Sequence, residues 1–146
     1  METTALEQSV VARNQAGRQA RKRLGRREHT YGPVERNFDP IELIERQNAT
    51  RLQELVPIRH GRMAESAFAF YRGTAAVMAA DLAQRPHTGI TVQLCGDAHL
   101  ANFGGFASPE RTLLFDVNDF DETLPGPFEW DLKRLVASAV LAATPA

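Results

Sequence analysis

The sequence has one cysteine, two lysines and no long apolar segment. Because Cys95 is alone, an internal disulfide and a cysteine-rich zinc site are both excluded. No apolar run approaches the roughly 20 residues of a bilayer-spanning helix, and the N-terminus has no apolar stretch like that of a signal peptide. Charge of one sign is not in excess either, since 17 basic and 18 acidic residues leave a net charge of −1. We therefore expect a soluble cytoplasmic protein with no membrane partner and no overall attraction to nucleic acid.

The first 38 residues differ in composition from the rest of the chain. Basic residues recur from Arg13 to Arg27 with no acidic residue among them. This pattern predicts a frayed helix or disordered arm over residues 1–30, followed by a linker with Gly32, Pro33 and Pro40. The arm is either a contact for nucleic acid or another acidic partner, or a solvated leader, and we favour the solvated leader. Residues 39–146, with most of the apolar residues, would form the folded unit.

The folded unit contains both helical and extended sequence patterns. Asp39 before Pro40 predicts the start of a helix that continues to about Leu55, where Pro57 ends it. We expect Arg59 to Arg62 in a loop. The further elements expected are an apolar helix from Ser66 or Phe70 to Ala83, strands over 90–95, 103–107 and 112–117, a loop over 124–127, and a helix over 130–143 with its apolar residues on one face. The predicted fold class is α+β, with a β-hairpin flanked by helices.

Two short motifs at the base of this hairpin contain most of the chemically unusual residues. They are Leu-Cys-Gly-Asp-Ala-His-Leu-Ala-Asn over residues 94–102 and Phe-Asp-Val-Asn-Asp-Phe-Asp-Glu over residues 115–122. If the strand ends are adjacent, several carboxylates converge, which is favourable mainly where a cation or a proton-transfer task offsets their repulsion. Magnesium fits this chemistry best because it prefers carboxylate and other hard oxygen ligands. The alternative is an ordinary hairpin in which Asp and Asn residues cap the loops.

The two motifs resemble the catalytic segment of kinase-like phosphotransferases, especially the aminoglycoside and choline kinase group with its Gly-Asp-x-His-x-x-Asn pattern. The resemblance implies a partial protein-kinase-like domain that uses Mg²⁺ and ATP. Asp97 would be the catalytic base and His99 would position the catalytic loop. Metal ligands would come from Asn102, Asp119, Asp121 and Asp116, of which Asp119 is preferred to Asp116. Asp131 would begin a helix that supports the catalytic loop.

Two arginines complete the predicted site. Arg72 lies in an apolar stretch, where a guanidinium needs a carboxylate or phosphate partner, and we assign it to the phosphates of the cofactor. We expect Arg72 or Arg134 to pair with an acidic residue of the two motifs. We also expect the carboxyl groups of Asp97 and Asp119 to lie within about 10 Å, the span of one bound metal–phosphate unit.

Longer runs of the sequence resemble the bacterial family DUF2252. The resemblance rests on Arg-His-Gly-Arg-Met over 59–63, Phe-Ala-Phe-Tyr-Arg-Gly over 68–73, Gln-Leu-Cys-Gly-Asp-Ala-His over 93–99, Asn-Phe-Gly over 102–104, residues 115–123, and Pro-Gly-Pro-Phe-Glu-Trp-Asp over 125–131. It extends from about Asp39 to the C-terminus. Members are several hundred residues long and have no assigned activity. The resemblance implies that this chain is a truncated N-terminal portion, catalytically silent, with the glycine-rich loop and ATP-binding lysine lying downstream.

Three functions remain open. The first is a Mg²⁺- and ATP-dependent phosphotransferase acting on a small-molecule or protein acceptor. The second is a metal-dependent phosphoesterase, because Asp97-Ala-His99 is an Asp-x-His sequence at a strand end. The third is a binding or scaffolding module with no catalysis.

Overall fold

The structure is a computed structural model that describes residues 9–30 and 35–144. Its α-helices are α1 (Val10–Arg23), α2 (Pro40–Asn48), α3 (Val56–Met63), α4 (Ala67–Arg72), α5 (Ala75–Ala83) and α6 (Glu129–Ala143). Short 3₁₀ helices are η2 (Arg26–His29), η3 (Gln53–Leu55) and η4 (Leu100–Asn102), and the strands are β1 (Thr91–Leu94), β2 (Phe103–Ala107), β3 (Leu113–Val117) and β4 (Leu124–Pro127). This mixture confirms the α+β class.

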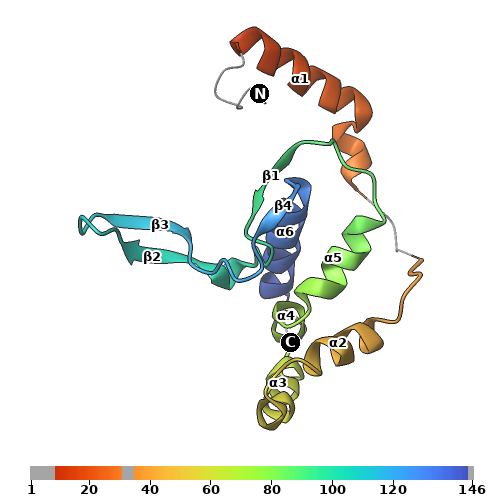
Figure 1. Ribbon diagram of the computed structural model, residues 1–146, viewed down its shortest axis with the longest axis vertical. Coiled ribbons are helices and arrows are strands. Elements are labelled where there is room, and N and C mark those ends of the chain that lie inside the picture. Colours follow the sequence, from red (N-terminus) through yellow and green to blue (C-terminus); the bar gives the residue numbers. More distant parts are fainter. Residues whose placement is uncertain (1–8, 31–34, 145–146) are drawn as a thin grey trace.

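The strands form two separate antiparallel pairs. β2 pairs with β3, which confirms the predicted hairpin, and this hairpin extends away from the helices (Figure 1). β1 pairs with β4, so the prediction of a loop over residues 124–127 is wrong. Pro125 and Pro127 are tolerated in β4 because each strand of a two-stranded sheet has an open edge, where a missing N–H costs no ladder bond.

The helices before β1 differ from prediction at three places. Asp39 caps α2 as predicted, since its Oδ1 accepts from the Ile41 N–H (2.8 Å), but α2 ends at Asn48. The loop predicted over residues 59–62 is wrong, because Pro57 occupies the first turn of α3 and does not end a helix. The helix predicted up to Ala83 is divided between α4 and α5 at Gly73, where a Cβ would lie 2.6 Å from the Met63 sulfur.

The described part of the N-terminal arm is helical. Ala20 and Leu24 are buried, and Arg23 Nη1 donates to the carbonyl oxygen of Thr88 (3.0 Å), so the C-terminal end of α1 contacts the loop before β1. Residues 1–8 of the predicted arm and residues 31–34 of the predicted linker lie outside the described residues. In the described parts of the chain, no helix combines the length and the apolar character needed to cross a bilayer.

α6 confirms the predicted C-terminal helix but packs through its polar side. Glu129, Arg134 and Ser138 are buried, whereas Leu132, Val136 and Val140 are 51%, 55% and 61% exposed. In Figure 1, α6 lies behind the β1–β4 pair and beside α4 and α5. Its inward polar side chains therefore face the loop that follows β1, where the first acidic motif lies.

Candidate functional site

The loop after β1 is held at three points by one side of α6. Asp131 accepts from the backbone N–H groups of Cys95 (2.8 Å) and Gly96 (3.1 Å). Three residues further along, Arg134 contacts the carboxylate of Asp97, and Ser138 Oγ accepts from the Leu100 N–H (2.9 Å). Residues three and four apart share a helix face, so a single helix fixes the loop from beginning to end. The helical support predicted for Asp131 is therefore present.

Gly96 allows the two acidic motifs to meet. Its φ of +87° lies in the left-handed region, and a Cβ there would lie 2.2 Å from the carbonyl oxygen of Glu122. The backbone of the second motif therefore lies directly against the turn of the first. The Asn118 N–H also donates to the carbonyl oxygen of Asn102 (2.8 Å), which joins the motifs at a second point.

Arg134 and Asp97 form a buried ion pair. Nε and Nη2 of Arg134 both lie 2.5 Å from Oδ1 of Asp97, and the Arg134 side chain is 3% exposed. Nη2 also donates to the carbonyl oxygen of Tyr71 (3.0 Å), and the guanidinium lies 4.4 Å from the centre of the Tyr71 ring. The prediction that Arg72 or Arg134 pairs with an acidic residue is confirmed for Arg134. The expectation that Arg72 needs an anionic partner because it is buried in an apolar helix is wrong, since Arg72 is exposed.

His99 is buried against the Asp97 carboxylate. Its Nε2 lies 3.6 Å from Asp97 Oδ2, and its ring meets Phe68 edge-on at a centroid distance of 6.4 Å. Burial lowers the pKa of His99; the Asp97 charge opposes this shift, and the charges of Arg72 and Arg134 add to it. The His99 N–H donates to the carbonyl oxygen of Asp97 (2.7 Å), so the residue also shapes the loop backbone.

Asn102 presents an oxygen beside Asp97. Its Nδ2 donates to the backbone carbonyl oxygen of Asp97 (2.9 Å), which fixes the amide group and leaves Oδ1 as the atom able to accept a cation. Asp119 is exposed, and its Oδ1 accepts from the Asp121 N–H (3.1 Å). One side-chain oxygen from each of the two motifs therefore lines the cavity beside this loop.

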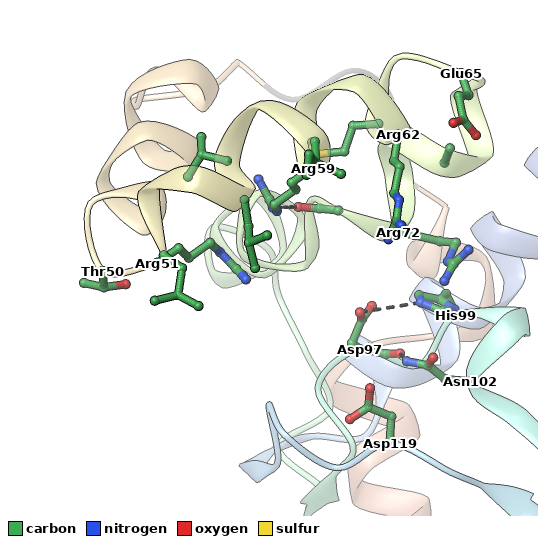
Figure 2. Close-up of a pocket in the computed structure, with 17 residues that line it drawn as sticks. Thr50, Arg51, Arg59, Arg62, Glu65, Arg72, Asp97, His99, Asn102 and Asp119 are labelled. Atoms are coloured by element: carbon green, nitrogen blue, oxygen red, sulfur yellow. Dashed lines mark hydrogen bonds and ion pairs between the residues drawn. The ribbon is translucent and has the colours of Figure 1, made fainter.

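A cavity of about 970 Å³ brings five of the predicted site residues together (Figure 2). These are Arg72, Asp97, His99, Asn102 and Asp119. Asp116 and Asp121 are not among the lining residues. Asp116 Oδ1 instead accepts from the N–H of its neighbour Val117 (2.8 Å) within β3.

A second set of charges faces the acidic motifs across this cavity. We call it the arginine wall: Arg51, Arg59, Arg62 and Arg72, from η3, α3 and α4 and their flanks. The guanidinium of Arg59 donates to Asn48 Oδ1 (3.2 Å) and to the carbonyl oxygen of Gly73 (2.5 Å), both neutral acceptors. Within residues 9–30 and 35–144, the other three guanidiniums form no ion pair. Sequence reasoning found only Arg72, because the others were expected in a loop or in a surface helix.

The oxygen donors that line the cavity could supply only part of a metal ion's coordination shell. Over the described residues there is no group of three or more His, Cys, Asp or Glu side chains able to hold a metal ion. Magnesium commonly takes one or two carboxylates and completes its shell with water and substrate phosphate. Asp119 and the Oδ1 of Asn102 provide such a partial set.

The comparisons with known proteins establish the family. The fold and site define an α+β protein whose cavity is lined by Asp97 and Asp119 from the acidic motifs and, facing them, by the arginine wall and Glu65. The model of the family DUF2252, described as an uncharacterized protein conserved in bacteria, matches residues 51–146. The chain belongs to this family, as its sequence motifs predicted. All residues that line the cavity, except Thr50, lie within the matched segment. No curated protein and no solved structure was found to match the chain.

Proposed function

We propose that the cavity binds ATP with Mg²⁺ and supports transfer of the terminal phosphoryl group to a hydroxyl of an acceptor. One observation carries this proposal: oxygen ligands from two motifs lie across a single cavity from the arginine wall. A bound nucleoside triphosphate needs both kinds of charge, since its phosphates are anionic and its usual partner is a divalent cation. The reaction would proceed by positioning and electrostatic stabilisation, with little covalent chemistry from the protein.

In this proposal Asp97 orients the acceptor. Its Oδ1 is occupied by Arg134, so Oδ2 is the oxygen left to accept a hydrogen bond from the acceptor hydroxyl. The ion pair with Arg134 holds this carboxylate in a fixed orientation. Asp97 would therefore fix the direction of attack and take the hydroxyl proton as the new O–P bond forms and the bond from the terminal phosphorus to the leaving ADP oxygen breaks.

The remaining residues would bind the phosphates of ATP, either directly or through Mg²⁺. Asn102 and Asp119 would hold Mg²⁺, which neutralises charge on the phosphate oxygens when it is bound. Arg62 and Arg72 are exposed within the cavity, and a guanidinium donates two parallel hydrogen bonds to a phosphate. In this proposal they would act together with the ATP-binding lysine that the family resemblance places downstream of the acidic motifs.

Isothermal titration of the chain with ATP, with and without Mg²⁺, tests the binding half of the proposal. We expect Mg²⁺ to strengthen ATP binding, Asp119→Asn to remove this Mg²⁺ dependence, and Arg72→Gln to weaken binding about tenfold or more. Asp121→Asn is the matched control, because Asp121 lies outside the cavity lining, and it should behave as wild type. Absence of Mg²⁺-dependent ATP binding, or equal effects of Asp119→Asn and Asp121→Asn, would overturn the proposal.

A further inference from the structure

The cavity has apolar lining residues that phosphate binding does not use. Leu52, Leu55 and Ile58 line it and are 66%, 51% and 53% exposed. They come from one short stretch, which passes through η3 into the first turn of α3. Single exposed aliphatic side chains are ordinary on protein surfaces, but three that line one cavity are typical of a place where an apolar ligand is covered.

A positive charge accompanies these apolar side chains. Arg51 precedes Leu52 in the chain, and Figure 2 shows its guanidinium pointing into the cavity on the same wall as Arg59. Burial lowers the pKa of Arg59, and the nearby charge of Arg51 lowers it further, which places the two guanidiniums within electrostatic range. In the parts of the chain that the structure describes, Arg51 has no carboxylate partner. An anion bound beside it would offset the repulsion between the two arginines.

We infer that the acceptor is an amphipathic anion, with an apolar body against Leu52, Leu55 and Ile58 and an anionic group at Arg51. This inference rests on the proposed function, because Asp97 receives the acceptor hydroxyl while Arg62 and Arg72 serve ATP. At about 970 Å³, the cavity lies at the upper end of the range for small-molecule sites, which leaves volume for an acceptor beside the triphosphate. Phosphate and carboxylate groups both meet the requirement at Arg51.

Titration of the chain with hexyl phosphate, inorganic phosphate and hexanol, all in EDTA, tests the inference. We expect hexyl phosphate to bind at least about tenfold more tightly than either inorganic phosphate or hexanol, because only it satisfies both the charge and the apolar surface. Arg51→Gln should weaken binding of hexyl phosphate, and Leu55→Asn should remove its advantage over inorganic phosphate. Matched controls are Arg13→Gln on α1 and Leu113→Asn on the hairpin, both at exposed residues outside the cavity.

Each outcome of this titration has a distinct meaning. Equal affinities for hexyl phosphate and inorganic phosphate, or wild-type affinity after Leu55→Asn, would overturn the apolar part of the inference. Equal affinities for hexyl phosphate and hexanol, or wild-type affinity after Arg51→Gln, would overturn the anionic part. Because EDTA removes Mg²⁺, hexyl phosphate binding is separate from Mg²⁺-dependent ATP binding. If hexyl phosphate fails to bind but ATP binds with Mg²⁺, only the acceptor class is rejected. If hexyl phosphate binds but ATP does not bind with Mg²⁺, the proposed function and the acceptor role are both rejected, and a binding site for amphipathic anions remains.

Discussion

Arg134 and Asp97 lie 37 residues apart in sequence and form an ion pair in which both side chains are largely buried, with 3% and 14% of their side-chain surfaces exposed. The pair joins α6 to the loop of the first acidic motif. A buried pair adds little net stability relative to apolar residues of the same size, but loss of one partner leaves an uncompensated charge in a poorly solvated place. The orientation of Asp97 and the stability of the fold therefore depend on the same contact.

We expect Arg134→Met to destabilise the protein by about 3–5 kcal/mol, because the Asp97 carboxylate would remain buried without its partner. Urea denaturation followed by circular dichroism measures this change. Arg46→Met, at an exposed position of α2, is the control and should change the free energy of unfolding by less than about 0.5 kcal/mol. Similar unfolding midpoints for the two variants would show that the pair does not stabilise the loop.

Replacement by alanine should change the stability of the fold in opposite directions at two glycines. At Gly96 the φ of +87° and the contact with Glu122 exclude a Cβ, so Gly96→Ala should destabilise the fold by more than about 1 kcal/mol. At Gly61, inside α3, a Cβ would meet nothing within 4 Å, so Gly61→Ala should stabilise by about 0.5–1 kcal/mol. Thermal unfolding of both variants measures the two changes in stability. A neutral Gly96→Ala would contradict the close contact between the two motifs.

The sequence predicted what short-range patterns determine. The β2–β3 hairpin, the Asp39 cap and the position of Asp97 after a strand follow from local spacing, turn residues and side-chain chemistry. The arginine wall could not be predicted, because its members converge only through the packing of α3 against η3 and α4. The buried side of α6 was missed for a related reason. The periodicity of apolar residues identifies a helix, but it does not identify which face of the helix is covered by other segments. In this protein the loop after β1 covers α6, and that loop requires polar partners.

His99 should make stability depend on pH. Its pKa is lowered from 6.5 by burial, so below pH 6.5 the unfolded state binds a proton that the native state binds less readily. The resulting loss of stability begins near pH 6.5 and grows as the pH falls toward the native pKa. The urea midpoint should therefore be lower at pH 5 than at pH 7, and His99→Phe should reduce this difference. His87→Gln, at an exposed site, should retain it; an unchanged difference in His99→Phe would contradict the assignment.

Substitutions at Asp97 and Asp119 should affect different steps, the first turnover and the second the binding of ATP. In a full-length homologue that contains this segment, we expect Asp97→Asn to lower Mg²⁺- and acceptor-dependent release of ADP by about 10²–10⁴-fold with little change in ATP affinity, because Asp97 acts on the acceptor hydroxyl. Asp119→Asn should already weaken Mg²⁺-dependent ATP binding. Since Asp97→Asn also removes the partner of Arg134, its folding is checked by circular dichroism, and the neutral double variant Asp97→Asn/Arg134→Gln is measured beside it. If that wild-type homologue binds ATP with Mg²⁺ but releases no ADP in the presence of hydroxyl acceptors, phosphoryl transfer is rejected and a nucleotide-binding module remains. If both single variants match the wild type in binding and turnover, the acidic motifs serve only the structure of the loop.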